Sequence, residues 1–286
     1  MSDPVIDLDR VVTRPQLARD LRALGVAPGD ALMVHESVKA IGWVAGGPDV
    51  VIDALLDAVG SAGTLVKYVG SEDGTYALAE WPPEVQAAYR DTIPGFDPAT
   101  TRACRAWGIL TEYLRTRPGA VRSAHPEGSF AALGARAAEL MADHPLQDGL
   151  GPGSPLDKLV AMGGKVLLVG CPLAHTTLVH LAEYRARLPE KRRVRYEAPV
   201  MRGGERVWVT IEELDSSDGI VDWAGTDYFE LIVRAFLDAG LGRSGRVGHA
   251  ESHLMDAAAL VDFAARWMEE NLRGLPVTPH AVIKAE

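Results

Sequence analysis

The sequence has 286 residues, of which 47% are hydrophobic and 24% are charged, with 39 acidic residues against 29 basic ones. This composition is typical of an ordinary globular protein with a sizeable core, and the net charge of −10 argues against a protein that binds nucleic acid through its phosphates. No apolar run reaches the ~18 residues of a membrane span, residues 1–10 lack the features of a secretory signal, and Cys104 and Cys171 have no metal-type spacing, so we expect a reduced cytoplasmic protein without a membrane segment.

Helical and strand patterns alternate from the beginning of the chain. Residues 14–25 place leucines at helical spacing before Gly25, whereas residues 31–34 are a continuous apolar run that suits a buried strand. We expect further strands at residues 64–69 and 165–170 and further helices at residues 48–59, 105–116, 132–144, 155–164, 226–240 and 255–273. This alternation predicts an α/β fold in which a layered central β-sheet is flanked by helices.

Two further segments depart from this alternation. Residues 194–200 and 206–211 flank Met-Arg-Gly-Gly, which is the pattern of a β-hairpin. Residues 70–104 are long, broken and acidic, and such insertions are often binding loops or lids. Because no repeat or low-complexity linker divides the chain, we expect a single compact domain over residues 1–286. It would have tails at 1–13 and 274–286 and an inserted acidic lid loop over the substrate at 70–104.

A histidine and a carboxylate follow the third expected strand. If residues 175–184 form a helix, Thr177, His180 and Glu183 share one face, which would point into the cleft at the carboxyl end of that strand. A histidine, whose usual pKa is near ~6.5, could accept a proton there, and the carboxylate could orient its ring. The same spacing also fits a partly buried histidine with a helical salt-bridge partner.

Two other polar clusters have alternative interpretations. Residues 122–130, Arg-Ser-Ala-His-Pro-Glu-Gly-Ser-Phe, could meet a phosphate through Arg122 and donate hydrogen bonds from Ser123 or Ser129, or could form a surface turn. Residues 212–220 gather four acids, which form either a solvated loop or, together with the acids of residues 70–104, a wall that binds cations.

Taken together, these segments resemble the aminoglycoside 3-N-acetyltransferase family, the antibiotic acetyltransferases that use acetyl-CoA. The resemblance covers about residues 14–272 and depends on the order of its motifs, since each of them alone is unspecific. The motifs are VHESVKAIGWVAGG, GTLV, FDPATT, RSAHPEGSFAALG, GSPLDKLVAMGGKVLLVG, TTLVHLAEY, KR-V-YE-PV and GRVGHAESHLMDA.

The resemblance implies that the protein transfers an acetyl group from acetyl-CoA to the 3-amino group of the 2-deoxystreptamine ring, which gives antibiotic resistance. The amine would attack directly in a ternary complex, without an acetyl-enzyme intermediate and without a metal ion. By the same resemblance, His180 is the catalytic base, and Glu183 and Thr177 support the site around it. Removal of the amine proton by a positioned base contributes roughly 10²–10⁴-fold to the rate.

The resemblance also assigns the binding residues. The segment after the first strand would bind coenzyme A with its backbone amides, and the turn at 122–130 would share this duty. The implied coenzyme A residues are His35, Ser37, Val38, Lys39, Ile41, Gly42, Arg122, Ser123, His125 and Ser129. Since aminoglycosides are polycations, carboxylates would bind them. Glu213 and Asp215 match positions that contact the drug in relatives, and Asp73 and Asp97 are candidates in the inserted loop, where we expect drug specificity to reside.

The sequence is also compatible with three rival functions. A family relative with the same chemistry could act on an amine that is not an antibiotic. A metal-dependent hydrolase could use His175, His180 and Glu183, although no third ligand follows at a recognisable distance. A non-enzymatic binder could sequester cationic drugs. We expect a small-molecule substrate, no nucleic acid or membrane partner, and a monomer or homodimer.

Overall fold

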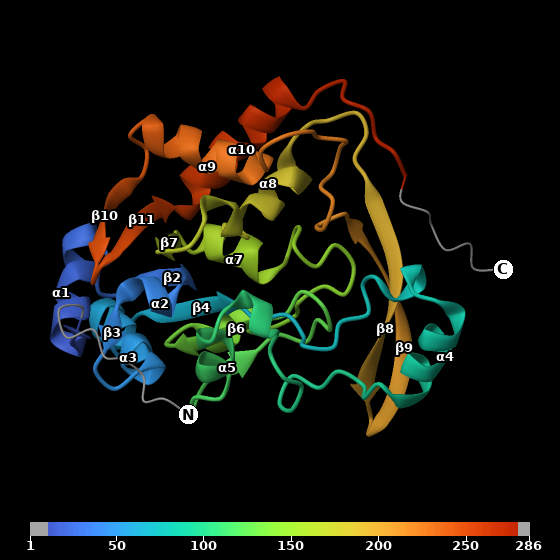
Figure 1. Ribbon diagram of the computed structural model, residues 1–286, viewed down its shortest axis with the longest axis horizontal. Helices are drawn as coiled ribbons and strands as arrows, with labels where there is room; N and C mark the ends of the chain where they lie inside the picture. Colours follow the sequence, from blue (N-terminus) through green and yellow to red (C-terminus); the bar gives the residue numbers. More distant parts are fainter. Residues whose placement is uncertain (1–10, 280–286) are drawn as a thin grey trace, which may run out of the picture.

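A seven-stranded sheet forms the centre of the computed structural model, which describes residues 11–279 (Figure 1). Its strand order is β10-β11-β7-β2-β4-β6-β5. The three central strands are parallel, namely β7 (Lys165–Val169), β2 (Ala31–Glu36) and β4 (Thr64–Tyr68). The outer strands pair antiparallel, namely β10 (Arg243–Val247), β11 (Ala250–Asp256), β6 (Phe130–Gly134) and β5 (Val121–Arg122).

Helices cover both faces of this sheet, because successive residues of a strand point to opposite faces. On β2, Leu32 and Val34 belong to one buried cluster, whereas Met33 belongs to the other. The helices on the Leu32 side are α1 (Arg14–Leu24), α3 (Pro48–Val59) and α5 (Leu110–Arg115). The helices on the Met33 side are α6 (Ala137–Met141), α7 (Pro155–Ala161), α8 (Val179–Arg185), α9 (Tyr228–Asp238) and α10 (Ala257–Asn271). The predicted layered α/β fold is therefore confirmed.

A long hairpin stands apart from the central sheet, at the right of Figure 1. Its strands are β8 (Arg193–Arg202) and β9 (Glu205–Leu214). The inserted segment is partly helical: α4 (Pro83–Thr92) lies along the hairpin, where Arg90 is 2.9 Å from a carboxylate oxygen of Glu197 and 4.8 Å from the ring centroid of Trp208. The smaller elements are β1 (Val11–Val12), β3 (Trp43–Val44), α2 (Val38–Ile41) and the 3₁₀ turns η2 (Leu78–Glu80), η3 (Arg105–Trp107) and η4 (Leu173–His175).

Several of the predicted elements differ from the structure. Residues 130–134 form β6, so the helix expected at 132–144 is reduced to α6, because pairing with β4 overrides the helical preference of an alanine-rich run. Strand β2 continues through His35 and Glu36, which pair with Leu168 and Val169 of β7. The antiparallel pair β10–β11 occupies a stretch where no strand was expected. Of the expected tails, residues 1–10 and 280–286 lie outside the described residues. Within residues 11–279, no helix is long and apolar enough to cross a membrane.

Candidate active site

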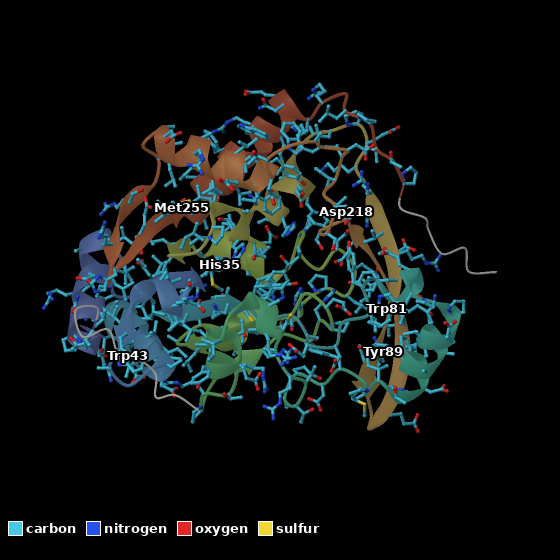
Figure 2. All side chains as sticks on the ribbon, in the orientation of Figure 1. His35, Trp43, Trp81, Tyr89, Asp218 and Met255 are labelled. Carbon is cyan, nitrogen blue, oxygen red and sulfur yellow. The ribbon has the colours of Figure 1, made fainter. Side chains whose placement is uncertain are left out.

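A cavity of about 1100 Å³ opens at the carboxyl ends of the parallel strands. The strand ends contribute Glu36, Lys67 and Gly170 to its lining. In Figure 2, His35 marks the sheet end of this cavity near the centre of the molecule, and Trp81 and Asp218 mark the end toward the hairpin. Parallel α/β sheets bind ligands at this edge, so the cavity is the candidate active site.

The centre of the site is a chain of three side chains from two helices. The Nδ1 atom of His180 lies 2.7 Å from Oε2 of Glu183, one turn along α8, and Tyr228 at the start of α9 donates its hydroxyl hydrogen to Oε1 of the same carboxylate. Glu183 is 1% exposed and His180 is 17% exposed. Burial, and then the charge of Glu183, raises the pKa of Tyr228 well above its usual value, which keeps the phenol a donor.

This arrangement fixes the tautomer of the histidine. Because the carboxylate can only accept, Nδ1 must carry the hydrogen, and in the neutral ring the lone pair is then on Nε2. Among residues 11–279, Nε2 of His180 has no hydrogen-bond partner, and His180 lines the cavity. The ring packs edge-on against Phe229, with 4.7 Å between centroids. In this geometry Nε2 of His180 could accept a hydrogen bond or a proton from a molecule bound in the cavity.

Two further acids line the cavity with their charges partly buried. Glu213 accepts hydrogen bonds from the hydroxyl of Tyr196 at 2.7 Å and from the backbone N–H of Gly149 at 3.3 Å. Glu127 accepts from the N–H and the hydroxyl of Thr75, at 2.5 and 3.0 Å. Burial raises the pKa of Glu127, and burial, with a smaller contribution from the charge of Glu127, raises the pKa of Glu213 to about 7. A cationic ligand would favour the ionised form of both acids.

A buried ion pair forms the sheet end of the cavity. Lys67 pairs with Glu36 and also donates to the carbonyl oxygen of Val34 at 3.2 Å, and the two charged side chains are only 5% and 1% exposed. Burial raises the pKa of Glu36 even though Lys67 opposes that shift. Burial also lowers the pKa of His35 to about 3, so its ring is neutral at physiological pH.

Comparison with known proteins decides the family. The family model described as aminoglycoside 3-N-acetyltransferase matches residues 33–269. Aminoglycoside N(3)-acetyltransferase VII of Streptomyces paromomycinus is 52% identical over 270 residues, covering 92% of this chain and 94% of that relative. The chain belongs to the aminoglycoside 3-N-acetyltransferase family.

Solved structures of this family agree with the fold. Aminoglycoside acetyltransferase AAC(3)-Xa has a TM-score of 0.89 with 52% identity, covering 93% of this chain and 95% of that one. AAC-IIIb in its binary complex with CoASH has a TM-score of 0.87 with 46% identity, covering 92% and 98%. The family resemblance, the fold class and the acyltransferase activity predicted from the sequence are confirmed. In the described part of the chain, no group of three or more His, Cys, Asp and Glu residues could hold a metal ion.

The cavity of this acetyltransferase contains about half of the site residues predicted from the sequence. Those that line it are His35, Ser37, Val38, Lys39, Thr177, His180, Glu183 and Glu213. Thr177 lies in the turn before α8 rather than on the helix, and its carbonyl oxygen accepts the backbone N–H of His180 at 3.1 Å. Ser37 caps the short helix α2, and its own N–H donates to the carbonyl of Val169 at 2.9 Å, so that amide is already used by the fold.

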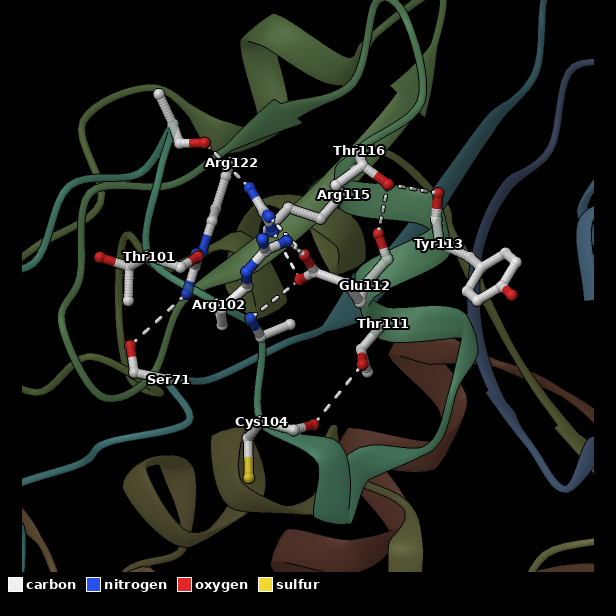
Figure 3. Close-up of polar contacts among 12 residues, drawn as sticks. Ser71, Thr101, Arg102, Cys104, Thr111, Glu112, Tyr113, Arg115, Thr116 and Arg122 are labelled. Carbon is white, nitrogen blue, oxygen red and sulfur yellow. Dashed lines mark hydrogen bonds and ion pairs between the residues drawn. The ribbon is translucent and has the colours of Figure 1, made fainter.

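The four predicted residues of the turn at 122–130 lie behind the cavity wall. Arg122 donates to the carbonyl oxygens of Gly70 and Thr101 and to the hydroxyl of Ser129. Figure 3 shows Arg122 beside Glu112, which pairs with Arg102 and Arg115. Ser123 and His125 are fully buried, and the ring of His125 accepts the N–H of Gly128. Arg122 and Ser129 hold Gly70, and His125 holds Gly128; both glycines line the cavity. Ile41 is in the core and Gly42 ends α2 with a positive φ.

Of the four predicted acceptor acids, only Glu213 is among the residues that line the cavity. Asp215 is fully buried, and its Oδ1 accepts the hydroxyl of Tyr76 at 2.9 Å. Asp73 is exposed outside the cavity lining, and Asp97 closes a turn by accepting the N–H of Ala99 at 2.7 Å. Cavity-lining residues that the sequence did not single out include Tyr76, Glu127, Asp218 and Tyr228. The motifs at 122–130 and 212–220 contained two of them, but nothing in the sequence pointed to the two tyrosines.

Proposed function

We propose that this aminoglycoside 3-N-acetyltransferase moves an acetyl group from acetyl-CoA to the 3-amino group of the 2-deoxystreptamine ring by direct attack, with His180 as the base. The observation that carries this assignment is the Tyr228–Glu183–His180 chain, which ends at an unpaired ring nitrogen in the cavity. The product no longer carries a cationic amine at that position, which accounts for antibiotic resistance.

In this mechanism the 3-ammonium group first releases one proton to water, which frees its lone pair. The amine nitrogen then forms a bond to the thioester carbonyl carbon and loses a second proton to Nε2 of His180. The imidazolium that results is stabilised by Glu183, whose second oxygen is held by Tyr228. The carbon–sulfur bond then breaks, and the proton on the imidazolium passes to the leaving thiolate, so the enzyme returns to its starting state. A positioned base of this kind contributes roughly 10²–10⁴-fold.

The acceptor would occupy the hairpin end of the cavity, where Glu127, Glu213 and Asp218 are found. Carboxylates there would bind the other ammonium groups of a polycation and raise its rate of encounter. Burial disfavours the ionised forms of Glu127 and Glu213, and a cation beside them would stabilise those forms. They therefore favour a polyamine sugar over a neutral acceptor.

The donor would occupy the sheet end, against the segment His35–Lys39. We assign the exposed ammonium of Lys39 to the phosphates of coenzyme A, together with the first N–H groups of α2. Arg122, His125 and Ser129 would act on the donor indirectly, because they support the wall formed by Gly70 and Gly128. Ser123 would act one step further away, through the N–H of Phe130 and the ring of His144.

The test is thiol release from acetyl-CoA with a panel of amines, followed by mapping of the acetylated nitrogen. The panel contains aminoglycosides with a free 3-amino group, aminoglycosides already acetylated at that nitrogen, and the linear polyamine spermidine. We expect release only with the first group and the product acetylated at N3. Equal thiol release with spermidine would assign the enzyme to another amine. Loss of turnover after addition of a metal chelator would favour the metal-dependent hydrolase.

We propose a lid role for residues 70–104, a single domain over residues 1–286, a cytoplasmic location, and a monomer or homodimer. Sedimentation of the purified chain measures the oligomeric state, and cell fractionation measures the location.

A further inference from the structure

The loop after β9 carries an acid into the acceptor end of the cavity. Residues 215–222 leave β9 at the buried Asp215, and Asp218 and Gly219 line the cavity. The Oδ1 atom of Asp215 accepts the N–H groups of Ser217 and Asp218, at 2.9 and 3.0 Å, and also the hydroxyl of Tyr76. One end of this loop is therefore fixed from inside the protein.

The other end of the loop is held by one arginine. Arg192, which directly precedes β8, is 7% exposed at its side chain and pairs with Asp222. Its Nη1 atom donates to the carbonyl oxygens of Asp218 and Gly219, both at 3.1 Å. Its backbone N–H donates to the carbonyl of Ile220 at 2.7 Å. A guanidinium that spans three loop residues restricts the loop more than a single contact could.

The same arginine also binds the C-terminal segment. Its Nε atom donates to the carbonyl oxygen of Thr278 at 2.8 Å. The hydroxyl of Thr278 donates to Asp222 at 2.6 Å, and the N–H of Asp222 donates to the carbonyl of Pro276 at 2.8 Å. Arg192, Asp222 and Thr278 thus close one hydrogen-bonded ring, which we call the loop latch.

We propose that Arg192 is a positioning residue for acceptor binding, which it serves by holding Asp218 in the cavity through the loop latch. This inference rests on the proposed function, because it takes the acceptor to lie beside Asp218. A carboxylate on a loop that is already fixed binds a cation without the cost of ordering that loop. Loss of the latch should therefore weaken acceptor binding while the chemistry at His180 continues.

The experiment compares Arg192→Lys with Arg193→Lys, a matched change at the neighbouring exposed arginine, which pairs with Asp148 outside the cavity. For Arg192→Lys we expect the KM for the aminoglycoside to rise about tenfold, which corresponds to ~1.4 kcal/mol. The kcat and the KM for acetyl-CoA should stay within about twofold, and Arg193→Lys should match the parent. Amide hydrogen exchange in residues 215–222 should become faster only in Arg192→Lys.

Thr278→Val provides a second test, because it removes one hydroxyl contact of the latch without changing charge. We expect a smaller rise of the same KM, and this variant decides the outcome if Arg192→Lys does not fold. An unchanged KM for the aminoglycoside overturns the proposal. It is also overturned if the KM values for both substrates rise together and the melting temperature falls. If the parent protein transfers no acetyl group, the proposed function fails, whereas the exchange data still test the latch itself.

Discussion

The Nδ1 atom of His180 and the Oε2 atom of Glu183 lie 2.7 Å apart on one turn of α8, with Glu183 almost completely buried. A buried carboxylate in this position orients the imidazole and stabilises the cation that forms when Nε2 accepts a proton. The contribution of this contact can be measured, because removal of the negative charge leaves the volume of the side chain nearly unchanged.

Glu183→Gln should therefore reduce kcat by about 10²-fold or more, with little change in the KM for acetyl-CoA. The matched control is Glu230→Gln on the outer part of α9, where Glu230 pairs with Arg234. Steady-state kinetics with both substrates measures the effect. A Glu183→Gln enzyme that turns over like Glu230→Gln would remove the carboxylate from the mechanism.

Tyr228 acts one step further from the reacting atoms, through its hydroxyl on Oε1 of Glu183. Tyr228→Phe keeps the packed ring but leaves a buried carboxylate oxygen without this donor, which costs about 1–3 kcal/mol. We expect kcat/KM to fall about tenfold, by less than in Glu183→Gln. The two changes should be strongly non-additive in the double variant, because they act on one network. Fully additive losses would contradict a shared network.

The pH dependence of acceptor binding should follow Glu213, whose pKa is raised to about 7 by burial. Above this pH the carboxylate is charged and attracts an ammonium group, and below it the protonated acid does not. The KM for the aminoglycoside should therefore rise as the pH falls from 8 to 6. Glu213→Gln should have a high KM that is nearly independent of pH over this range. If the parent and the variant showed the same pH profile of KM, another group would be responsible.

The Glu36–Lys67 pair should affect stability, since both side chains are almost inaccessible to water. Lys67→Met leaves a buried carboxylate without its partner, and changes of this kind cost roughly 3–5 kcal/mol. The double change Glu36→Gln with Lys67→Met should recover much of that loss. Denaturant unfolding of the three proteins provides the measurement. If Lys67→Met had the same free energy of unfolding as the parent, this would show that water reaches Glu36.

Much of the fold could be predicted because the local signals agree with the tertiary structure. Helix α3 has Pro48 at its first position and Gly60 after its last, and β7 is a plain apolar run. The strand β6 could not be recognised, because Ala131 and Ala132 favour a helix until β4 pairs with them. Tertiary pairing therefore decides where local preference is weak.

The candidate site could be predicted only where its residues are close in sequence. The spacing of His180 and Glu183 is visible on one helix, whereas Tyr228 reaches them from 45 residues away. Within residues 212–220 the acids look equivalent, yet Tyr76, 139 residues earlier, buries Asp215 and the loop leaves Asp218 in the cavity. Contacts between distant segments determine which acid meets a ligand.

The most direct test of the account is the turnover of His180→Ala, with His253→Ala as the matched control, since His253 lies on β11 and contacts Ser244 outside the cavity. We expect His180→Ala to fold, to bind coenzyme A as the parent does, and to lose two or more orders of magnitude in kcat. The control should keep its full rate. A folded His180→Ala enzyme with near-normal kcat would contradict the assignment of His180 as the base.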